Sequence, residues 1–348
     1  MFAFSTLAIS QVHDKSWKKI AMSKDLTWFG SEEAKLIAEN VLLYQRDIGG
    51  WPKNTLMQKT LTVGEKAELL EMKADSKGCT TDNGATFLEM TFLSKMYSQV
   101  KDERYKQAFL KALDYLLEAQ YPSGGWPQFY PLKKGYACHI TYNDDSMEHV
   151  MEILNDLIKN TGRFSIQPDE ATIERCKTAF EKGIDIILKT QYKQNGVLTA
   201  WCAQHDTLTL APAKARAYEL PSLSGQESAG LILVLMSADN PSVEIKTAVN
   251  AAVAWLEKTK ITGYKEVRFK DESGNKDRRL EPDENAEPIW GRFMELEDNT
   301  PFFCGRDGIK KYKLEEIEQE RRGGYGWHST APNEVLKKYP AWKMKWEK

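Results

Sequence analysis

A tryptophan-marked repeat of 75 residues is the feature that most restricts the fold of this chain. Trp51, Trp126 and Trp201 are equally spaced by that interval. The first two close nearly identical Gln-x-x-x-Gly-Gly-Trp-Pro segments, and the third, within residues 191–201, is degenerate. A unit of this length accommodates two helices of ordinary length with their loops. Three such units closing on one another predict a toroid of helix pairs.

Apolar residues recur at helical spacing through most of the chain before residue 260. The segments with this period are residues 31–44, 84–100, 103–120, 145–160, 170–191, 225–238 and 243–258. Clusters of Gly, Pro and Asn separate them, as expected for loops. The sequence therefore predicts an all-α fold, an (α/α)3 toroid or barrel of repeated helix pairs.

The character of the chain changes after residue 260, where charged and turn-forming residues dominate, most of all in Asp271–Glu287. Two short alternating stretches, Glu266–Lys270 and Arg292–Leu296, predict strands. The segment Glu315–Arg322 predicts a short helix. We therefore expect long irregular loops and a little β structure toward the C-terminus of the helical body.

The expected domain organisation is one domain over residues 31–330, preceded by an N-terminal extension, 1–30, and followed by a tail, 331–348. Residues 1–11 are an apolar run with a small-residue exit, similar to the end of a secretory signal segment but without its basic start. An ordinary unstructured N-terminus is the alternative. The signal interpretation predicts a secreted or periplasmic protein.

Charge and cysteine content exclude several classes of function. The net charge of −2 provides no basic field for nucleic acid. The five cysteines form no CxxC pair, so a zinc site is not indicated, and no apolar run is long enough to span a membrane. Eight arginines follow residue 210 and only four precede it. This asymmetry allows a locally cationic cleft, which an acidic polymer would need.

Two acidic loops stand at expected helix starts, in residues 80–86 and 139–147. The plain interpretation is helix capping, because a helix start favours negative charge and Asp82 or Asn83 would be an ordinary cap. Both loops, however, combine carboxylate and amide oxygens, which are the ligands of hard cations such as calcium. Helix starts on one rim of a toroid would bring the two loops together.

Three arginines stand in irregular segments after residue 210. Arg216 has Glu219 nearby, and an exposed ion pair of little energetic value is the plain interpretation. Arg292 and Arg306 are each set among apolar residues, where an unpaired guanidinium is costly. A guanidinium suits bidentate binding of a carboxylate.

An ordered set of these motifs resembles the pectate lyases of polysaccharide lyase family 10. The segments are Gly49–Asn54, Thr81–Thr86, Gly124–Tyr130, Thr141–Asp145, Ala215–Glu219, Arg292–Glu295 and Cys304–Gly308. The resemblance covers about residues 30 to 328. It implies an (α/α)3 toroid that cleaves polygalacturonate by calcium-assisted β-elimination and releases 4,5-unsaturated oligogalacturonates.

The resemblance also implies a role for particular residues. It makes Asp82 a calcium ligand and gives a second ligand to the Asn143-Asp144-Asp145 group, of which we take Asp144 rather than Asp145. Calcium is then the cofactor, and pectate is the partner of a monomeric enzyme.

The catalytic base implied by the resemblance is Arg306, with Arg216, Arg292 and Asn83 holding the substrate. Removal of the galacturonate C5 proton builds charge on the neighbouring carboxylate, and calcium and arginines neutralise that charge. The ordinary pKa of arginine is about 12.5–13.8, so a base role requires a dense positive field that disfavours the charged form. An alkaline optimum would follow.

Two other functions remain open at this level. A glycoside hydrolase acting on uronides would need two carboxylic residues as acid and base, and Asp82 and Asp144 are available for these roles. A non-catalytic helical-repeat carbohydrate binder is the third possibility. The set of arginines favours the lyase, because neither alternative needs it.

Overall fold

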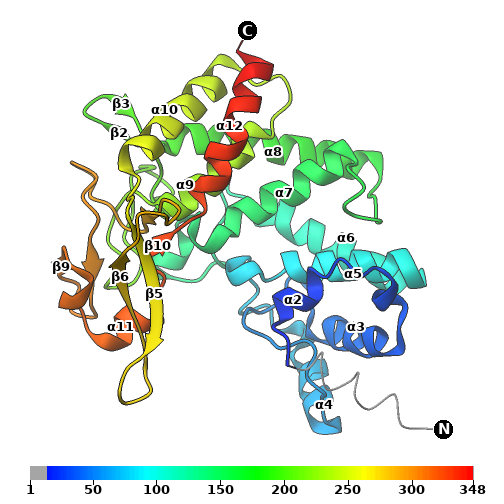
Figure 1. The fold of residues 1–348 in the computed structure, drawn as a ribbon. Coiled ribbons are helices and arrows are strands. Elements are labelled where there is room, and N and C mark those ends of the chain that lie inside the picture. Colours follow the sequence, from blue (N-terminus) through cyan, green and yellow to red (C-terminus); the bar gives the residue numbers. More distant parts are fainter. Residues whose placement is uncertain (1–13, 348) are drawn as a thin grey trace. The chain divides into compact units, whose positions relative to one another are not determined.

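The computed structural model describes residues 14–347 and is mostly helical, with no closed sheet in this part of the chain (Figure 1). The chain divides into two compact units, one within Met1–Lys134 and Asp144–Gly183, the other within Gly135–Asn143 and Ile184–Lys348. The expected mostly helical class is confirmed, whereas closure into a toroid and a single domain over residues 31–330 stay predictions. The signal segment expected in residues 1–11 lies outside the described residues.

The first unit is built on helix α5 (Phe87–Val100). The buried Phe92 of this helix packs against aromatic side chains from the segment before α3 (Glu32–Tyr44). The rings of Trp17 and Phe29 lie 5.0 and 5.5 Å from that of Phe92. Helices α6 and α7 also contact α5. The helices of this unit are α2 (Trp17–Ala21), α3 (Glu32–Tyr44), α4 (Val63–Glu71), α5 (Phe87–Val100), α6 (Glu103–Glu118), α7 (Ser146–Lys159) and the first part of α8 (Glu170–Thr190), with short turns η1 (Thr27–Gly30), η2 (Met72–Ala74) and η3 (Asp82–Gly84).

The repeated glutamines have one structural role. The side-chain amide of Gln45 donates to the carbonyls of Gly49 in its own loop and Ala108 on α6, both at 2.8 Å. Gln120 makes the same two bonds to its own loop and to α8, and Gln191 makes them to its own loop and to α10 (Val243–Thr259). Each glutamine therefore ties a helix end to its neighbour.

The repeated tryptophans are equally regular. The indole N–H of Trp51 donates to a carbonyl of the preceding helix at 2.8 Å, and those of Trp126 and Trp201 do the same at 2.7 Å. All three rings are at most 1% exposed. Burial of a large aromatic body with a satisfied N–H stabilises each helix junction, so these rings are unavailable for stacking on a carbohydrate.

The repeat needs glycine for a geometric reason. Gly49 and Gly124 have φ angles of 108° and 103°, which residues with a Cβ rarely adopt. A Cβ at Gly49 would lie 2.3 Å from the carbonyl oxygen of Lys111, and one at Gly124 would lie 2.1 Å from that of Lys182. Both loops therefore approach a neighbouring helix too closely for any other residue.

The second unit combines helices α9, α10 and α12, which pack on one another, with short strand pairs and irregular loops. Its elements are η4 (Gly135–Cys138), β1 (Ile140–Thr141), β2 (Lys193–Gln194), β3 (Val197–Leu198), β4 (Gln204–His205), α9 (Gly225–Met236), α10 (Val243–Thr259), β5 (Tyr264–Lys270), β6 (Lys276–Pro282), β7 (Trp290–Gly291), β8 (Phe303–Cys304), β9 (Lys310–Lys311), η6 (Leu314–Glu316), α11 (Gln319–Gly324), β10 (His328–Ser329) and α12 (Pro332–Trp346). The described strands form only two-stranded antiparallel pairs, β1–β4, β2–β3, β5–β6, β7–β10 and β8–β9.

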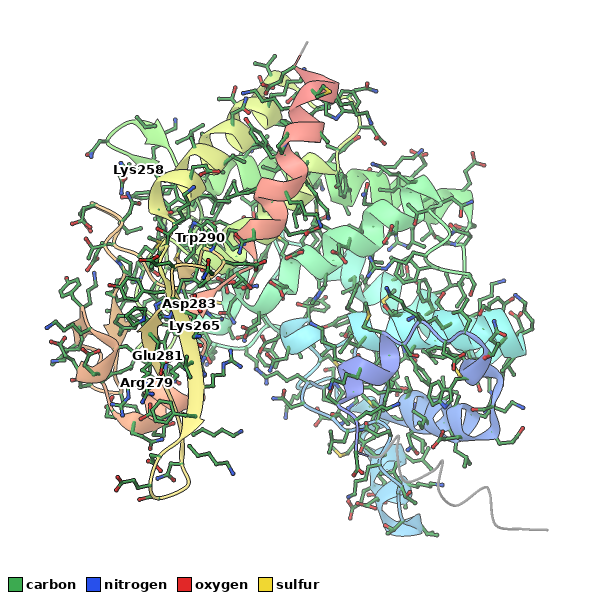
Figure 2. The ribbon with its side chains drawn as sticks, viewed as in Figure 1. Lys258, Lys265, Arg279, Glu281, Asp283 and Trp290 are labelled. Carbon is green, nitrogen blue, oxygen red and sulfur yellow. The ribbon has the colours of Figure 1, made fainter. Side chains whose placement is uncertain are left out.

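The longest strand pair is the β5–β6 hairpin, in which Tyr264 pairs with Pro282 and Lys270 with Lys276. Figure 2 labels two charged residues of this region, Lys265 and Asp283, which form an ion pair at 3.0 Å. The strand expected at Glu266–Lys270 is confirmed by β5. The partner strand β6 was not expected, because its run of charged residues resembles a loop until it is placed beside β5.

Two expectations for the C-terminal third are corrected, and the tail adds one helix. Arg292–Leu296 is not a strand: it is a bend with single bridges at Met294, and the short strand β7 ends before it. Glu315–Arg322 is divided into η6 and α11 rather than forming one helix. The tail 331–348 contains the 15-residue helix α12, which begins with Pro332 and packs on α9 and α10.

Within the described residues, no helix has both the length and the apolar character that crossing a bilayer would require. The five cysteines are all free thiols, and four of them are buried.

A buried carboxyl group in the first unit gives a test of this fold. Glu89 is 2% exposed and accepts the indole N–H of Trp17 at 2.6 Å. Burial raises the pKa of Glu89 to about 7 from an ordinary 4.5. The folded state thus binds this proton more tightly than the unfolded state, and stability is lost as pH rises from the unfolded value through the folded one.

We expect Glu89→Gln to abolish this decrease in the free energy of unfolding, which is on the order of 3 kcal/mol above neutral pH. Glutamine retains an acceptor for Trp17 but does not titrate. Urea unfolding of both proteins between pH 5 and 8 measures the difference, and parallel stability curves would contradict the assignment.

Candidate active site

The first acidic loop holds Asp82 away from solvent. Asp82 is 2% exposed and lies in η3, and its Oδ2 accepts from the Lys53 ammonium and from the Gln128 side-chain amide, the latter at 2.8 Å. Its Oδ1 is buried and has no hydrogen-bond partner. Helix α5 begins later, with Thr86 as its N-cap and no side-chain cap bond. The plain interpretation of Asp82 as the cap of this helix is therefore wrong.

The backbone of this loop is strained. Asn83 has φ 54°, and Thr86 has φ 67°, which is rare for a β-branched residue. The Thr86 hydroxyl donates to the Thr80 carbonyl at 2.9 Å and accepts from the backbone N–H of Trp51 at 3.3 Å. These bonds hold the strained residue in place, and such strain is most often found at functional sites.

The second acidic loop repeats the pattern. Turn η5 (Asn143–Asp145) precedes α7, and both aspartates have left-handed φ angles, 53° at Asp144 and 59° at Asp145. Asp145 is the N-cap residue of α7 but makes no side-chain cap bond. The hydroxyls of Thr81 and Ser146 are hydrogen-bonded, so the first loop is joined to the start of α7. The structure therefore places Asp82, Asn83 and Asp144 in the same unit, on two connected loops.

The residues of these loops fit a hard cation. Asp82 Oδ1 is an orphaned, buried carboxylate oxygen, and such a group is costly unless a donor or a cation satisfies it. The available donors are carboxylate and amide oxygens, which calcium prefers over nitrogen or sulfur ligands. Within residues 14–347, no group of three or more His, Cys, Asp or Glu side chains forms a conventional metal cluster. A cation here would complete its shell with other oxygens.

The predicted arginines meet in the second unit around two tyrosines. We call this the arginine–tyrosine cluster: Arg216, Arg292, Arg306 and Arg321 with Tyr218 and Tyr325. The guanidinium carbons of Arg216 and Arg306 lie 5.0 and 5.5 Å from the Tyr218 ring, and that of Arg292 lies 4.7 Å from the Tyr325 ring. Cation–π contacts lessen the cost of gathering like charges.

Arg216 is held by a buried carboxylate. Its Nε donates to Glu219 Oε2 at 2.8 Å, and its Nη2 donates to Oε1. The Tyr325 hydroxyl donates to the same Oε1 at 2.9 Å, and Glu219 is 6% exposed. Burial alone would raise the pKa of Glu219, but the bonds from Arg216 and Tyr325 lower it below its ordinary value. The buried Glu219 carboxylate thus orients Arg216, whose own side chain is 43% exposed.

Arg292 and Arg306 have different surroundings. Arg292 is mostly buried and donates from Nη2 to Asn143 Oδ1 at 2.9 Å and to the buried Glu227 at 3.3 Å. Arg306 is more than half exposed and donates from Nε and Nη2 to Glu320 at 3.0 and 2.8 Å. The hydrogen bonds that Arg306 donates to Glu320 raise the pKa of Arg306, so the pair disfavours the neutral guanidine that a base role requires.

Arg321 belongs to the cluster and was missed by the sequence reasoning. It is 4% exposed, its guanidinium carbon lies 3.8 Å from the Tyr218 ring and 4.4 Å from the Tyr325 ring, and its Nε and Nη2 are buried without hydrogen-bond partners. Burial lowers its pKa. The only sequence signal was an arginine pair within a short predicted helix, which looks like a solvated surface.

Comparisons with known proteins identify the family of this chain. The family model described as pectic acid lyase matches residues 45–336. A family 10 polysaccharide lyase from Cellvibrio cellulosa, solved as a mutant in complex with trigalacturonic acid, is 36% identical, covers 95% of this chain and 96% of its own, and has a TM-score of 0.76. A second structure of a family 10 polysaccharide lyase from Cellvibrio cellulosa is 37% identical, with 92% and 94% coverage and a TM-score of 0.75. No curated protein matches. The chain therefore belongs to the pectic acid lyase family and is a lyase that acts on polysaccharide.

Proposed function

We propose that this enzyme cleaves de-esterified α-1,4-polygalacturonate by calcium-assisted β-elimination. The observation that carries the proposal is the arginine–tyrosine cluster, because four guanidinium groups around two tyrosines suit a substrate with one carboxylate per sugar. The related Cellvibrio lyase in complex with trigalacturonic acid supports the same substrate class. The proposed enzyme is a monomer that is secreted or periplasmic, since its substrate is an extracellular polymer.

In the proposed mechanism, Arg216 and Arg292 hold substrate carboxylates and Asn83 bonds a sugar hydroxyl. Arg306, in its neutral form, accepts the proton from C5 of the galacturonate. The electron pair of the C5–H bond forms the C4–C5 double bond, and the C4–O bond breaks. The departing oxygen takes a proton from solvent, so one product carries a 4,5-unsaturated uronate and the other a new hydroxyl.

Asp82 and Asp144 are the proposed calcium ligands, and the unpartnered Oδ1 of Asp82 supports this assignment. When bound, calcium supplies positive charge to a substrate carboxylate and so makes the C5 proton more acidic. The Lys53 ammonium, which bonds Asp82 Oδ2, balances part of the carboxylate charge.

The hydrolase alternative is weaker on the same geometry. A glycoside hydrolase acid must be protonated at the working pH. Asp82 is instead buried, and its Oδ2 already accepts from the Lys53 ammonium and the Gln128 amide. A two-carboxylate hydrolysis also has no need of the four guanidinium groups of the arginine–tyrosine cluster.

Polygalacturonate incubated with the enzyme, with and without excess chelator, tests the proposal. We expect the ultraviolet absorbance of the unsaturated product to rise with calcium and to be abolished by the chelator. Methyl-esterified pectin should be a poor substrate. Undiminished cleavage in chelator would refute the calcium role, and new reducing ends without absorbance would indicate a hydrolase. Binding without any product would indicate a carbohydrate binder.

A further inference from the structure

A pocket of about 340 Å³ lies in the first unit beside the Asp82 loop. This volume falls within the range of ~300–1,000 Å³ usual for small-ligand sites. Asn83 and Lys53 both line it, and Lys53 also bonds Asp82. The pocket is therefore continuous with the loop that we assign to the reaction.

The lining has the chemistry of a site for an acidic sugar. Lys18 and Lys53 supply two ammonium groups, and the side chains of Asn54 and Asn83 are hydrogen-bonded to each other at 3.0 Å. This bond uses one donor and one acceptor, while each amide has capacity for more. Trp17 contributes an apolar aromatic surface. Cations match a carboxylate, amides match hydroxyls, and apolar surface matches the C–H face of a sugar ring.

One wall comes from a segment outside the family match. Trp17 and Lys18 belong to α2, whereas the match to the family begins at residue 45. The position of this wall is fixed, because the Trp17 indole donates a hydrogen bond to the buried Glu89. The Lys15 carbonyl, just before α2, also accepts from Gln58 at 2.7 Å. Lys18 is exposed on this anchored helix, so its ammonium can meet a ligand without rearrangement of the backbone.

We propose that this pocket is a subsite beside the Asp82 loop that binds a further de-esterified galacturonate unit of a long substrate, with the Lys18 and Lys53 ammonium groups on its carboxylate. The inference rests on the proposed function. It makes α2 a determinant of chain-length preference, because a trimer that occupies the reacting centre need not reach the pocket, whereas a longer chain does.

Lys18→Ala tests the subsite, with Lys19→Ala as the matched control on the same helix, since Lys19 is exposed and does not line the pocket. For hexagalacturonate we expect Lys18→Ala to raise KM about threefold to tenfold, which is within the range for the net loss of one ordinary hydrogen bond, because Lys18 is exposed to solvent. Its kcat should stay within about twofold, and trigalacturonate kinetics should not change. Lys18→Glu should raise the hexamer KM further.

Unchanged hexamer KM in both Lys18 variants would overturn the subsite, and so would an equal rise of KM for trimer and hexamer. Calorimetric binding of hexagalacturonate to the wild type and to Lys18→Ala separates this proposal from the proposed function. If the wild type forms no unsaturated product, the reaction assignment fails, and the pocket is still judged by whether Lys18→Ala weakens hexamer binding.

Discussion

Replacement of Arg306 by alanine is expected to lower kcat by about 10²–10⁴-fold, the usual range for loss of a general base, while KM for polygalacturonate changes little. A group that acts only in proton removal stabilises the transition state and not the bound ground state. Initial rates measured in the ultraviolet over a range of substrate concentrations give both constants. Arg306→Lys should also be poor, because an ammonium does not reproduce the planar guanidinium.

Arg216→Ala is the matched comparison within the arginine–tyrosine cluster. A carboxylate clamp acts on the bound substrate, so its loss should raise KM. If Arg306→Ala instead retains near-normal kcat and raises KM, Arg306 is a clamp. The base would then be sought at Arg321, whose pKa is lowered by burial, among the lysines or in bound water.

The pH profile gives a second check on Arg306. Activity should rise toward alkaline pH, because only the neutral guanidine accepts a proton. The hydrogen bonds that Arg306 donates to Glu320 raise the pKa of Arg306, so Glu320→Gln should move this rise to lower pH. Arg306 and Glu320 are both more than half exposed, so solvent screens the pair and a substrate carboxylate can replace Glu320. An unmoved profile in Glu320→Gln would contradict the base assignment.

Asp82→Ala is the second substitution with a large expected effect. Loss of a calcium ligand removes charge stabilisation worth several kcal/mol, and about 1.4 kcal/mol corresponds to tenfold in rate, so turnover should fall about 10²-fold or more. The fold should survive, because Asp82 does not cap α5 and its partner Lys53 is partly exposed to solvent, where its ammonium can be hydrated. Circular dichroism and ultraviolet rates measured together test both statements.

Calcium titration distinguishes a metal-binding role of Asp82 from a structural one. Asp82→Asn keeps an oxygen for Gln128 but loses the charge, so it should need more calcium for half-maximal rate than the wild type. Melting of the helices in Asp82→Ala would show that Asp82 is structural. An Asp82→Ala enzyme with wild-type rate and calcium dependence would remove Asp82 from the metal site.

The sequence by itself determined the helical body and its repeated junctions. Helical periodicity is a local property, so α3 and α5 to α10 lie close to their expected ranges. The Gln-Gly-Trp repeat was also readable, because its residue types recur at a fixed interval and two of its bonds, from Gln45 to Gly49 and from Trp51 to Val41, are local in the sequence. A missed local signal was the capping box of Thr62 and Glu65 at the start of α4.

Only the tertiary structure decided the features that depend on segments far apart in the sequence. Strand β6 exists because β5 pairs with it, and α12 is ordered by packing on α9 and α10. Asp82 and Arg321 have sequence surroundings that fit a helix cap and a solvated surface, whereas the structure buries both and leaves atoms of each without partners. Burial and charge pairing are set by contacts between distant segments, and no local pattern records them.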